Sequence, residues 1–107
     1  MSAMPKRIRL APFDVAVVED PITLPAEHRG EWDGQRLRIN VCVTLDPGRK
    51  RVTLVHELIH ALLEAQGHPL VRGGTATEEE VCDVLAPALV TLVRANPDLV
   101  EYLTTRD

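Results

Sequence analysis

Short apolar runs in the first half of the chain show a pattern that is typical of β-strands. Residues 7–11 and 13–18 are β-prone runs separated by a proline, which excludes a single helix through both. Asp33-Gly34 is a dipeptide that favours a tight hairpin turn. The run from Gln35 to Val43 alternates apolar and polar side chains and predicts a half-buried strand. The apolar face of that strand is expected to comprise Leu37, Ile39, Val41 and Val43. We therefore expect a small antiparallel sheet of about three strands.

The second half of the chain changes to the apolar period of helices. The first helical pattern begins at about Arg49 and ends at Gly67, a residue typical of a helix C-terminus. A second helix is predicted to open near Thr77 and to run past Leu92. Pro87 lies inside that second pattern and is expected to kink or interrupt the helix, because proline lacks a backbone donor.

A short last helix and the order of the elements complete the predicted fold. Asn96 is expected to act as the N-cap of this helix, with Pro97 at its first helical position. The second helix should dock on the first through an apolar set of Val81, Leu85, Ala88, Leu89 and Leu92. Strands followed by helices predict an α+β fold, with the helices packed on one face of the sheet.

Length and composition narrow the class of protein. A chain of 107 residues has room for one core, so we expect a single domain over residues 1–107. No apolar run approaches the ~20 residues that cross a bilayer, and no signal core follows the start, which predicts a cytoplasmic protein without a membrane partner. The net charge of −4 and an aromatic content of 3% argue against a nucleic-acid partner. Cys42 and Cys82 are too few for a disulfide framework and are expected to be reduced.

The candidate chemistry is concentrated in His56-Glu57-Leu58-Ile59-His60, inside the first predicted helix. Histidines at i and i+4 lie one turn apart on one helix face, so both imidazoles can reach the same ion. Zinc suits two neutral imidazoles, a third protein ligand and an open position for water. Glu57 can point at that water without ligating the metal, accept its proton during attack on a carbonyl, and pass it to the leaving amine.

The third ligand is expected on a neighbouring element, and two candidates remain open. Glu79 and Asp83 stand at i and i+4 on the second helix, where one residue could bind zinc while the other holds a ligating histidine. His68, just beyond the first helix, is the rival ligand. Tyr102 and His28 could each donate to the oxyanion, a role worth ~3–4 kcal/mol where it is present.

Two stretches resemble a known family. Residues 51–60, RVTLVHELIH, resemble the Arg-x-Thr-Leu-x-His-Glu-Leu-x-His core of ImmA/IrrE-type metallopeptidases, compact members of the gluzincin group. Residues 79–90, EEVCDVLAPALV, resemble their Glu-x-x-Ala-Asn/Asp-x-Phe-Ala-x-x-Leu-Leu stretch. The resemblance covers about residues 30–92. It implies that the zinc ligands are His56, His60 and Glu79, that Glu57 is the general base, and that Asp83 holds a ligating histidine through its second ring nitrogen.

The expected function is hydrolysis of a peptide bond in a protein or peptide substrate by a zinc-dependent endopeptidase, with one Zn²⁺ per chain. Members of the family cleave regulatory proteins such as repressors. An SprT-like protease with His68 as third ligand is one alternative, and a non-catalytic module in which zinc joins two helices is another. Because a small core leaves a shallow cleft, a partner chain or self-association is expected to complete the groove.

Overall fold

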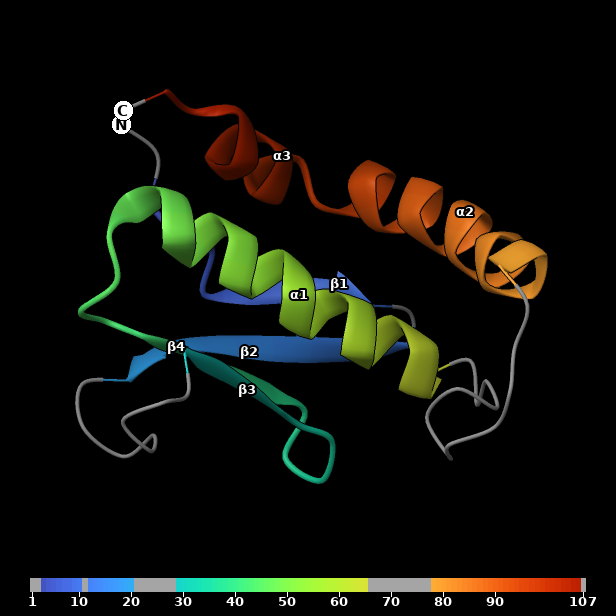
Figure 1. The fold of residues 1–107 in the computed structure, drawn as a ribbon, viewed down its shortest axis with the longest axis horizontal. Coiled ribbons are helices and arrows are strands. Elements are labelled where there is room, and N and C mark those ends of the chain that lie inside the picture. The colour runs from blue at the N-terminus through green and yellow to red at the C-terminus, as the bar shows by residue number, and fades with distance from the viewer. Residues whose placement is uncertain (1–2, 11, 21–28, 66–77, 107) are drawn as a thin grey trace.

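The computed structural model describes residues 3–10, 12–20, 29–65 and 78–106, which form a sheet followed by three helices (Figure 1). The strands are β1 (Arg7–Leu10), β2 (Phe13–Asp20), β3 (Gly30–Asp33) and β4 (Arg38–Cys42). The helices are α1 (Pro47–Ala65), α2 (Glu78–Ala95) and α3 (Pro97–Thr104). The α+β class predicted from the order of strands and helices is confirmed.

The sheet is mixed, which corrects the expectation of about three antiparallel strands. Its four strands have the order β1-β2-β4-β3. The pairs β1–β2 and β3–β4 are antiparallel, whereas β2 and β4 are parallel. The hairpin of β3 and β4 joins the sheet through β4 rather than through β3, and this makes the pairing with β2 parallel. As a result β3 lies at one edge of the sheet.

The turn between β3 and β4 is longer than a two-residue hairpin, and it shortens the strand predicted from Gln35. Asp33 pairs with Arg38, and the Asp33 carboxylate accepts hydrogen bonds from the backbone of Gln35 and Arg36 at 3.1 Å. Leu37 adopts a positive φ of 52° and belongs to the turn. Of the four apolar positions expected on one face of this strand, only Ile39 and Val41 are fully buried.

Helix α1 is the main cover of the sheet. It packs on β3 and β4, whereas α2 contacts α1, α3 and β1. The most completely buried side chains come from the sheet, α1 and α3: Ile8, Val15, Ile39, Val41, Leu54 and Leu99. Asp46 accepts a hydrogen bond from the Arg49 backbone at 2.9 Å and caps the start of α1. Lys50 binds Glu19 of β2 at 3.0 Å, which ties α1 to the sheet.

Helix α2 remains helical through Pro87, so the proline does not end it. Its apolar set docks only in part: Leu92 is buried, Leu85 and Ala88 are partly buried against the core, and Leu89 is 39% exposed. The predicted start at Thr77 and the predicted end of the first helix at Gly67 lie outside the described residues.

Asn96 precedes α3, as predicted, but its side chain does not cap the helix. The residue is buried, and its side chain binds β1 instead. Its Oδ1 accepts from the Arg9 backbone at 2.7 Å, and its Nδ2 donates to the carbonyls of Arg9 and Leu92 at 2.8 Å. Asn96 therefore joins the first strand to the junction of the last two helices.

Both cysteines are free, as expected. Cys42 lies at the end of β4, where a hydrogen bond with the Thr44 hydroxyl lowers the pKa of its thiol. Across the described ranges, none of the helices has the length and apolar character needed to cross a membrane.

Candidate metal centre

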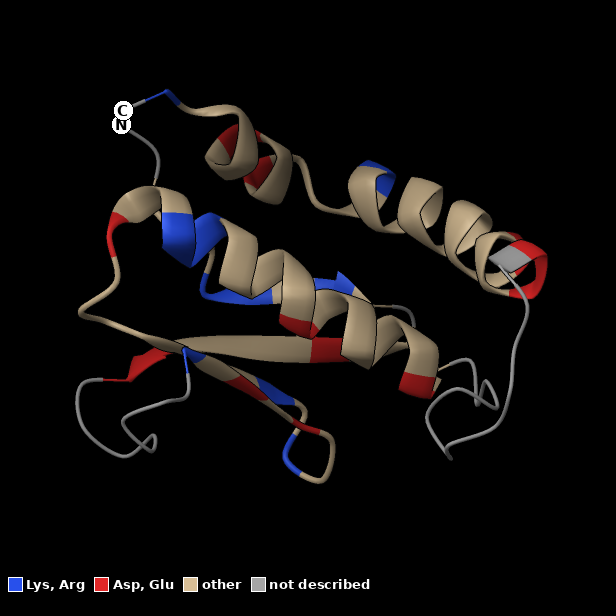
Figure 2. Cartoon of the chain, viewed as in Figure 1, with Lys and Arg blue, Asp and Glu red and all other residues tan. Residues whose placement is uncertain are grey.

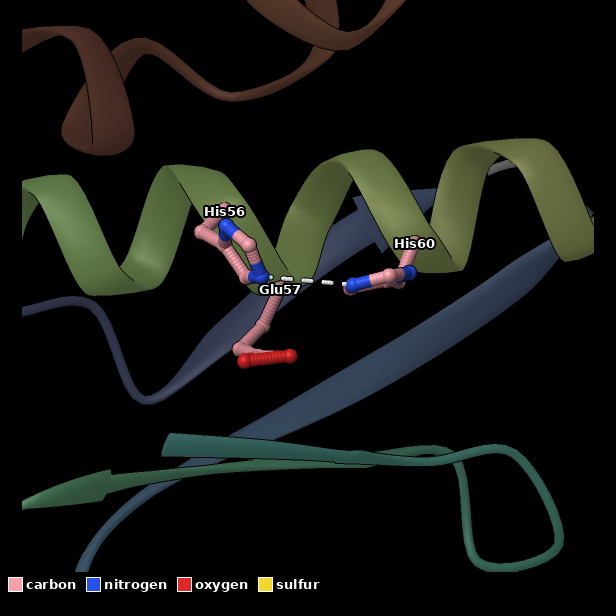
Figure 3. A group of neighbouring side chains, drawn as sticks. All are labelled: His56, Glu57 and His60. Carbon is pink, nitrogen blue, oxygen red and sulfur yellow. Dashed lines mark hydrogen bonds between the residues drawn. The ribbon is translucent and has the colours of Figure 1, made fainter. Parts of the chain in front are cut away.

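Helix α1 presents His56, Glu57 and His60 together (Figure 3). Its apolar face, which includes Leu54 and Leu58, is buried on the sheet and fixes the rotation of the helix. That rotation leaves His56 and His60 exposed and turns Glu57 inward. One ligand atom from each of the three residues lies within 4.8 Å of the others. The three polar residues of the sequence pattern therefore form a compact group of two imidazoles and one carboxylate.

The two imidazoles approach each other through their Nε2 atoms, which are 3.3 Å apart. Their ring centroids are 4.9 Å apart and the ring planes meet at 71°. Two nitrogens bound to one tetrahedral zinc at ~2.0–2.1 Å are separated by about 3.3 Å. The separation of the two Nε2 atoms therefore matches that of two nitrogen ligands on a single zinc ion.

Glu57 is only 7% exposed and points from α1 toward the sheet, beside the histidine pair (Figure 3). No side chain in the described part of the chain forms a hydrogen bond with its carboxylate. A carboxylate without such a partner keeps its oxygen lone pairs available to a polar ligand. Glu57 is thus placed to act on a molecule held at the two histidines.

Strand β3 passes very close to Glu57, and Gly30 is the reason that it can. A Cβ at position 30 would lie 2.5 Å from Thr53 Cγ2, 3.0 Å from the Asn40 carbonyl and 3.4 Å from Glu57 Cγ. Any side chain larger than hydrogen would push β3 away from α1. The edge strand and the buried carboxylate are therefore neighbours because of this glycine.

A second contact holds the hairpin of β3 and β4 on α1. The Trp32 indole N–H of β3 donates to the Glu64 carboxylate, and Gly34 lies close to the same carboxylate. Sequence reasoning missed Gly30, Trp32 and Glu64. A lone glycine before an apolar strand residue can indicate close backbone approach, and Glu64 lies one turn after His60 on the same helix.

The other predicted site residues are not part of this group. Glu79 and Asp83 are exposed on the first turns of α2. Tyr102 is 5% exposed in the core, under the Arg51 guanidinium at 5.4 Å from its ring centroid. Arg51 also donates to the Tyr102 carbonyl at 3.1 Å, so this tyrosine anchors α3 to α1. His28 and His68 lie outside the described residues.

Comparison with protein families gives the decisive match. The family model for the IrrE N-terminal-like domain of M78 peptidases matches residues 11–90, most of the chain. The chain belongs to this family. The M78 match begins before β2, includes all of α1 and extends into α2. No curated protein and no solved structure matches the chain.

Family membership implies that this M78 domain is a peptidase, and it confirms the resemblance seen in the sequence. M78 peptidases are zinc-dependent, and the His56, Glu57 and His60 group on α1 supplies donors that suit zinc. The spacing of the two Nε2 atoms agrees independently with that metal.

Proposed function

We propose that the domain is a zinc-dependent endopeptidase that hydrolyses a peptide bond in a protein substrate, with Glu57 as the general base. One observation supports this most directly: a buried carboxylate lies beside two histidines whose Nε2 atoms are 3.3 Å apart. A purely structural zinc site is closed by four protein ligands and has no use for such a carboxylate. The arrangement therefore favours a catalytic site over a module in which zinc only joins two helices.

His56 and His60 would hold the zinc ion through Nε2, and we propose Glu79 as the third ligand. When bound, the ion supplies a Lewis acid that polarises the scissile carbonyl and acidifies water. Glu79 lies in the first turn of α2, the helix that contacts α1, and it is the glutamate of the stretch that resembles the second motif of the family. Asp83, one turn later, would orient a ligating histidine through its second ring nitrogen.

Glu57 would carry the proton in the reaction. Its carboxylate accepts a proton as water attacks the substrate carbonyl, and it then donates that proton to the leaving amine. No other carboxylate among the described residues lies within the group of ligand atoms, so this role falls to Glu57.

Strand β3 offers a surface for the substrate backbone. It lies at the edge of the sheet and borders Glu57 through Gly30. Edge strands carry backbone groups that can pair with an extended peptide. We propose that the substrate lies along this edge, which would bring a peptide bond to the metal without a deep specificity pocket.

The test is Glu57→Gln in the zinc-loaded protein, assayed on a diverse peptide library with products read by mass spectrometry. We expect zinc content and fold to be unchanged, and cleavage to fall by about 10²–10⁴-fold, because the amide cannot accept the proton. Glu101→Gln, on the exposed side of α3, is the matched control and should cleave normally. Cleavage by Glu57→Gln at the wild-type rate would show that the general-base assignment is wrong.

A further inference from the structure

A small pocket lies at the end of α1, one turn beyond the histidine pair. It is bounded by the last turns of α1, by β3 with the turn that follows it, and by the facing ends of β1 and β2, and its volume is about 200 Å³. Apolar side chains that include Phe13, Val15, Trp32 and Leu37 form most of its wall, and Glu64 is the charged member of the described residues that line it. We propose that this pocket, here called the Trp32 pocket, binds an arginine or lysine side chain of the substrate, an inference that rests on the proposed function.

The Trp32 pocket lies on the proposed path of the substrate. Glu64 follows His60 by one helical turn, a rise of about 6 Å along α1. On β3, Gly30 borders Glu57, and Trp32 lies two residues and about 7 Å further along the strand. The Trp32 indole N–H donates to Glu64, so helix α1 and strand β3 run from the metal group to the pocket in the same direction. An extended peptide on β3 with its scissile bond at the metal would therefore bring a side chain within two residues of that bond to the pocket.

Positive charge near the pocket is already neutralised, whereas the charge of Glu64 is not. Arg9 of β1 pairs with Asp14 at 3.3 Å, and Arg36 of the turn after β3 pairs with Asp33 at 3.8 Å. Among the ion pairs of the described residues, none includes Glu64. Its carboxylate can therefore accept a charge-assisted hydrogen bond from a cation that the substrate brings.

The charges along α1 favour the same occupant. Figure 2 shows basic residues in the first turns of this helix and acidic residues further along it. From Val52 to Ala65 the charged residues are Glu57 and Glu64, and the last turn has no basic residue. Because the carbonyl end of a helix carries partial negative charge, a cation in the pocket is attracted by the helix as well as by Glu64.

An arginine or lysine side chain also suits the walls of the pocket. Its alkyl stem can pack on apolar groups while its charged head stays at a polar rim. Trp32 is half-buried and Glu64 is exposed, so the pocket offers an aromatic ring to the stem and a carboxylate to the head. The volume is below the ~300–1,000 Å³ of pockets that hold a whole ligand, which fits a single side chain.

The first test uses Trp32, the single tryptophan of the chain, as a fluorescent reporter of the pocket. The full-length Glu57→Gln variant with added zinc, which leaves the peptide intact, is titrated with three blocked alanine pentapeptides whose central residue is arginine, norleucine or glutamate. We expect the arginine peptide to change the Trp32 emission and to bind about five- to tenfold more tightly than the norleucine peptide, which has a stem without a charge. The glutamate peptide should bind most weakly. Equal affinity for arginine and norleucine, or no change in emission with any peptide, would overturn the proposal.

Variants at position 64 in the same background assign the preference to the carboxylate. Glu64→Gln keeps an oxygen that accepts from the Trp32 indole, so the pocket should hold its shape while the arginine peptide loses its advantage. Glu64→Lys should reverse the order and favour the glutamate peptide. Glu31→Gln is the matched control, because Glu31 is the exposed neighbour of Trp32 and its side chain points to the opposite face of β3. A preference for arginine that survives Glu64→Gln would exclude the role given to Glu64.

The second test separates the pocket from the peptidase activity. In the peptide-library assay, the wild type should cleave sites that carry arginine or lysine at one fixed position within two residues of the scissile bond, and Glu64→Gln should lose this enrichment. Cleavage without any basic preference would overturn the pocket and leave the peptidase in place. Binding of the arginine peptide by a protein that cleaves nothing would support the pocket and contradict the proposed function.

Discussion

Adjacent residues of one motif have opposite surroundings in this protein. His56 is exposed and Glu57 is 7% exposed, although they are neighbours in the chain. A helix turns by about 100° per residue, so a helix that is fixed by its apolar face sends the two side chains in different directions. The motif could be found in the sequence, and its place on a helix could be predicted. The burial of Glu57 could not, because it depends on a strand that arrives from residue 30.

The third metal ligand is a prediction that can be tested at the level of single residues. We expect Glu79→Ala to lower zinc affinity by about 10–100-fold or more, whereas His68→Ala should leave it unchanged. Glu80→Ala, the next residue along, is the control for lost negative charge. Zinc binding is measured by competition with a chromophoric chelator. The reverse pattern, with loss only in His68→Ala, would support the SprT-like arrangement.

The close approach of β3 to α1 at Gly30 leads to a second prediction for a single residue. Gly30→Ala should destabilise the fold by about 1–3 kcal/mol, because the new methyl group meets Thr53 and a backbone carbonyl. The control is Gly34→Ala, whose methyl group has the carboxylate end of the Glu64 side chain as its nearest neighbour, rather than a backbone carbonyl, and should cost less.

Chemical denaturation measures the free energy of unfolding of both glycine variants. Thr53→Ser removes the nearest atom, Cγ2, and should restore part of the stability when combined with Gly30→Ala. If Gly30→Ala were as stable as the wild type, the close approach of β3 to α1 would be in doubt.

At the scale of elements, the sheet and the helices are joined by a few polar contacts between distant segments. Arg51 bonds α1 to the Tyr102 carbonyl in α3. Asn96 bonds the α2–α3 junction to both backbone groups of Arg9 in β1. Sequence reasoning assigned Asn96 to a cap because asparagine before proline is typical of that position. The side chain instead satisfies backbone groups of β1, a partner that local sequence does not reveal.

Loss of the Asn96 contacts should therefore be costly. Asn96→Ala removes the partner of a buried carbonyl in α2 and of part-buried backbone groups in β1, and we expect about 2–3 kcal/mol of destabilisation. For a domain of this size, that lowers the melting temperature by about 10–20 °C. Asp98→Ala, at the exposed start of α3, is the comparison and should have a much smaller effect. The melting temperatures of both variants are measured by thermal unfolding with circular dichroism as the signal. An equal decrease in melting temperature in the two variants would contradict the structural role of Asn96.

For the molecule as a whole, local sequence patterns predicted the helices and strands better than they predicted how the strands pair and how the helices pack. The α+β class and the three helices follow from periodicity and from turn residues. The parallel pairing of β2 with β4 could not be predicted, because it is decided by which arm of the hairpin reaches β2. The His56, Glu57 and His60 group could be predicted because it lies within about one turn of helix. A ligand on α2 depends on helix packing, so it stays a prediction.

The bond between Arg9 and Asn96 joins residues 87 positions apart, whereas the metal group and the strands beside it lie within Gly30–Ala65. These two parts of the fold therefore have very different contact orders. Short-range contacts form with little loss of chain entropy, and closing a long loop costs more. The two hairpins and α1 can accordingly assemble early, whereas the Asn96 contact with β1 forms only after the last helices have been synthesised. The His56, Glu57 and His60 group is thus held by contacts between segments that are close in sequence, whereas the packing of the last helices depends on a contact between distant parts of the chain.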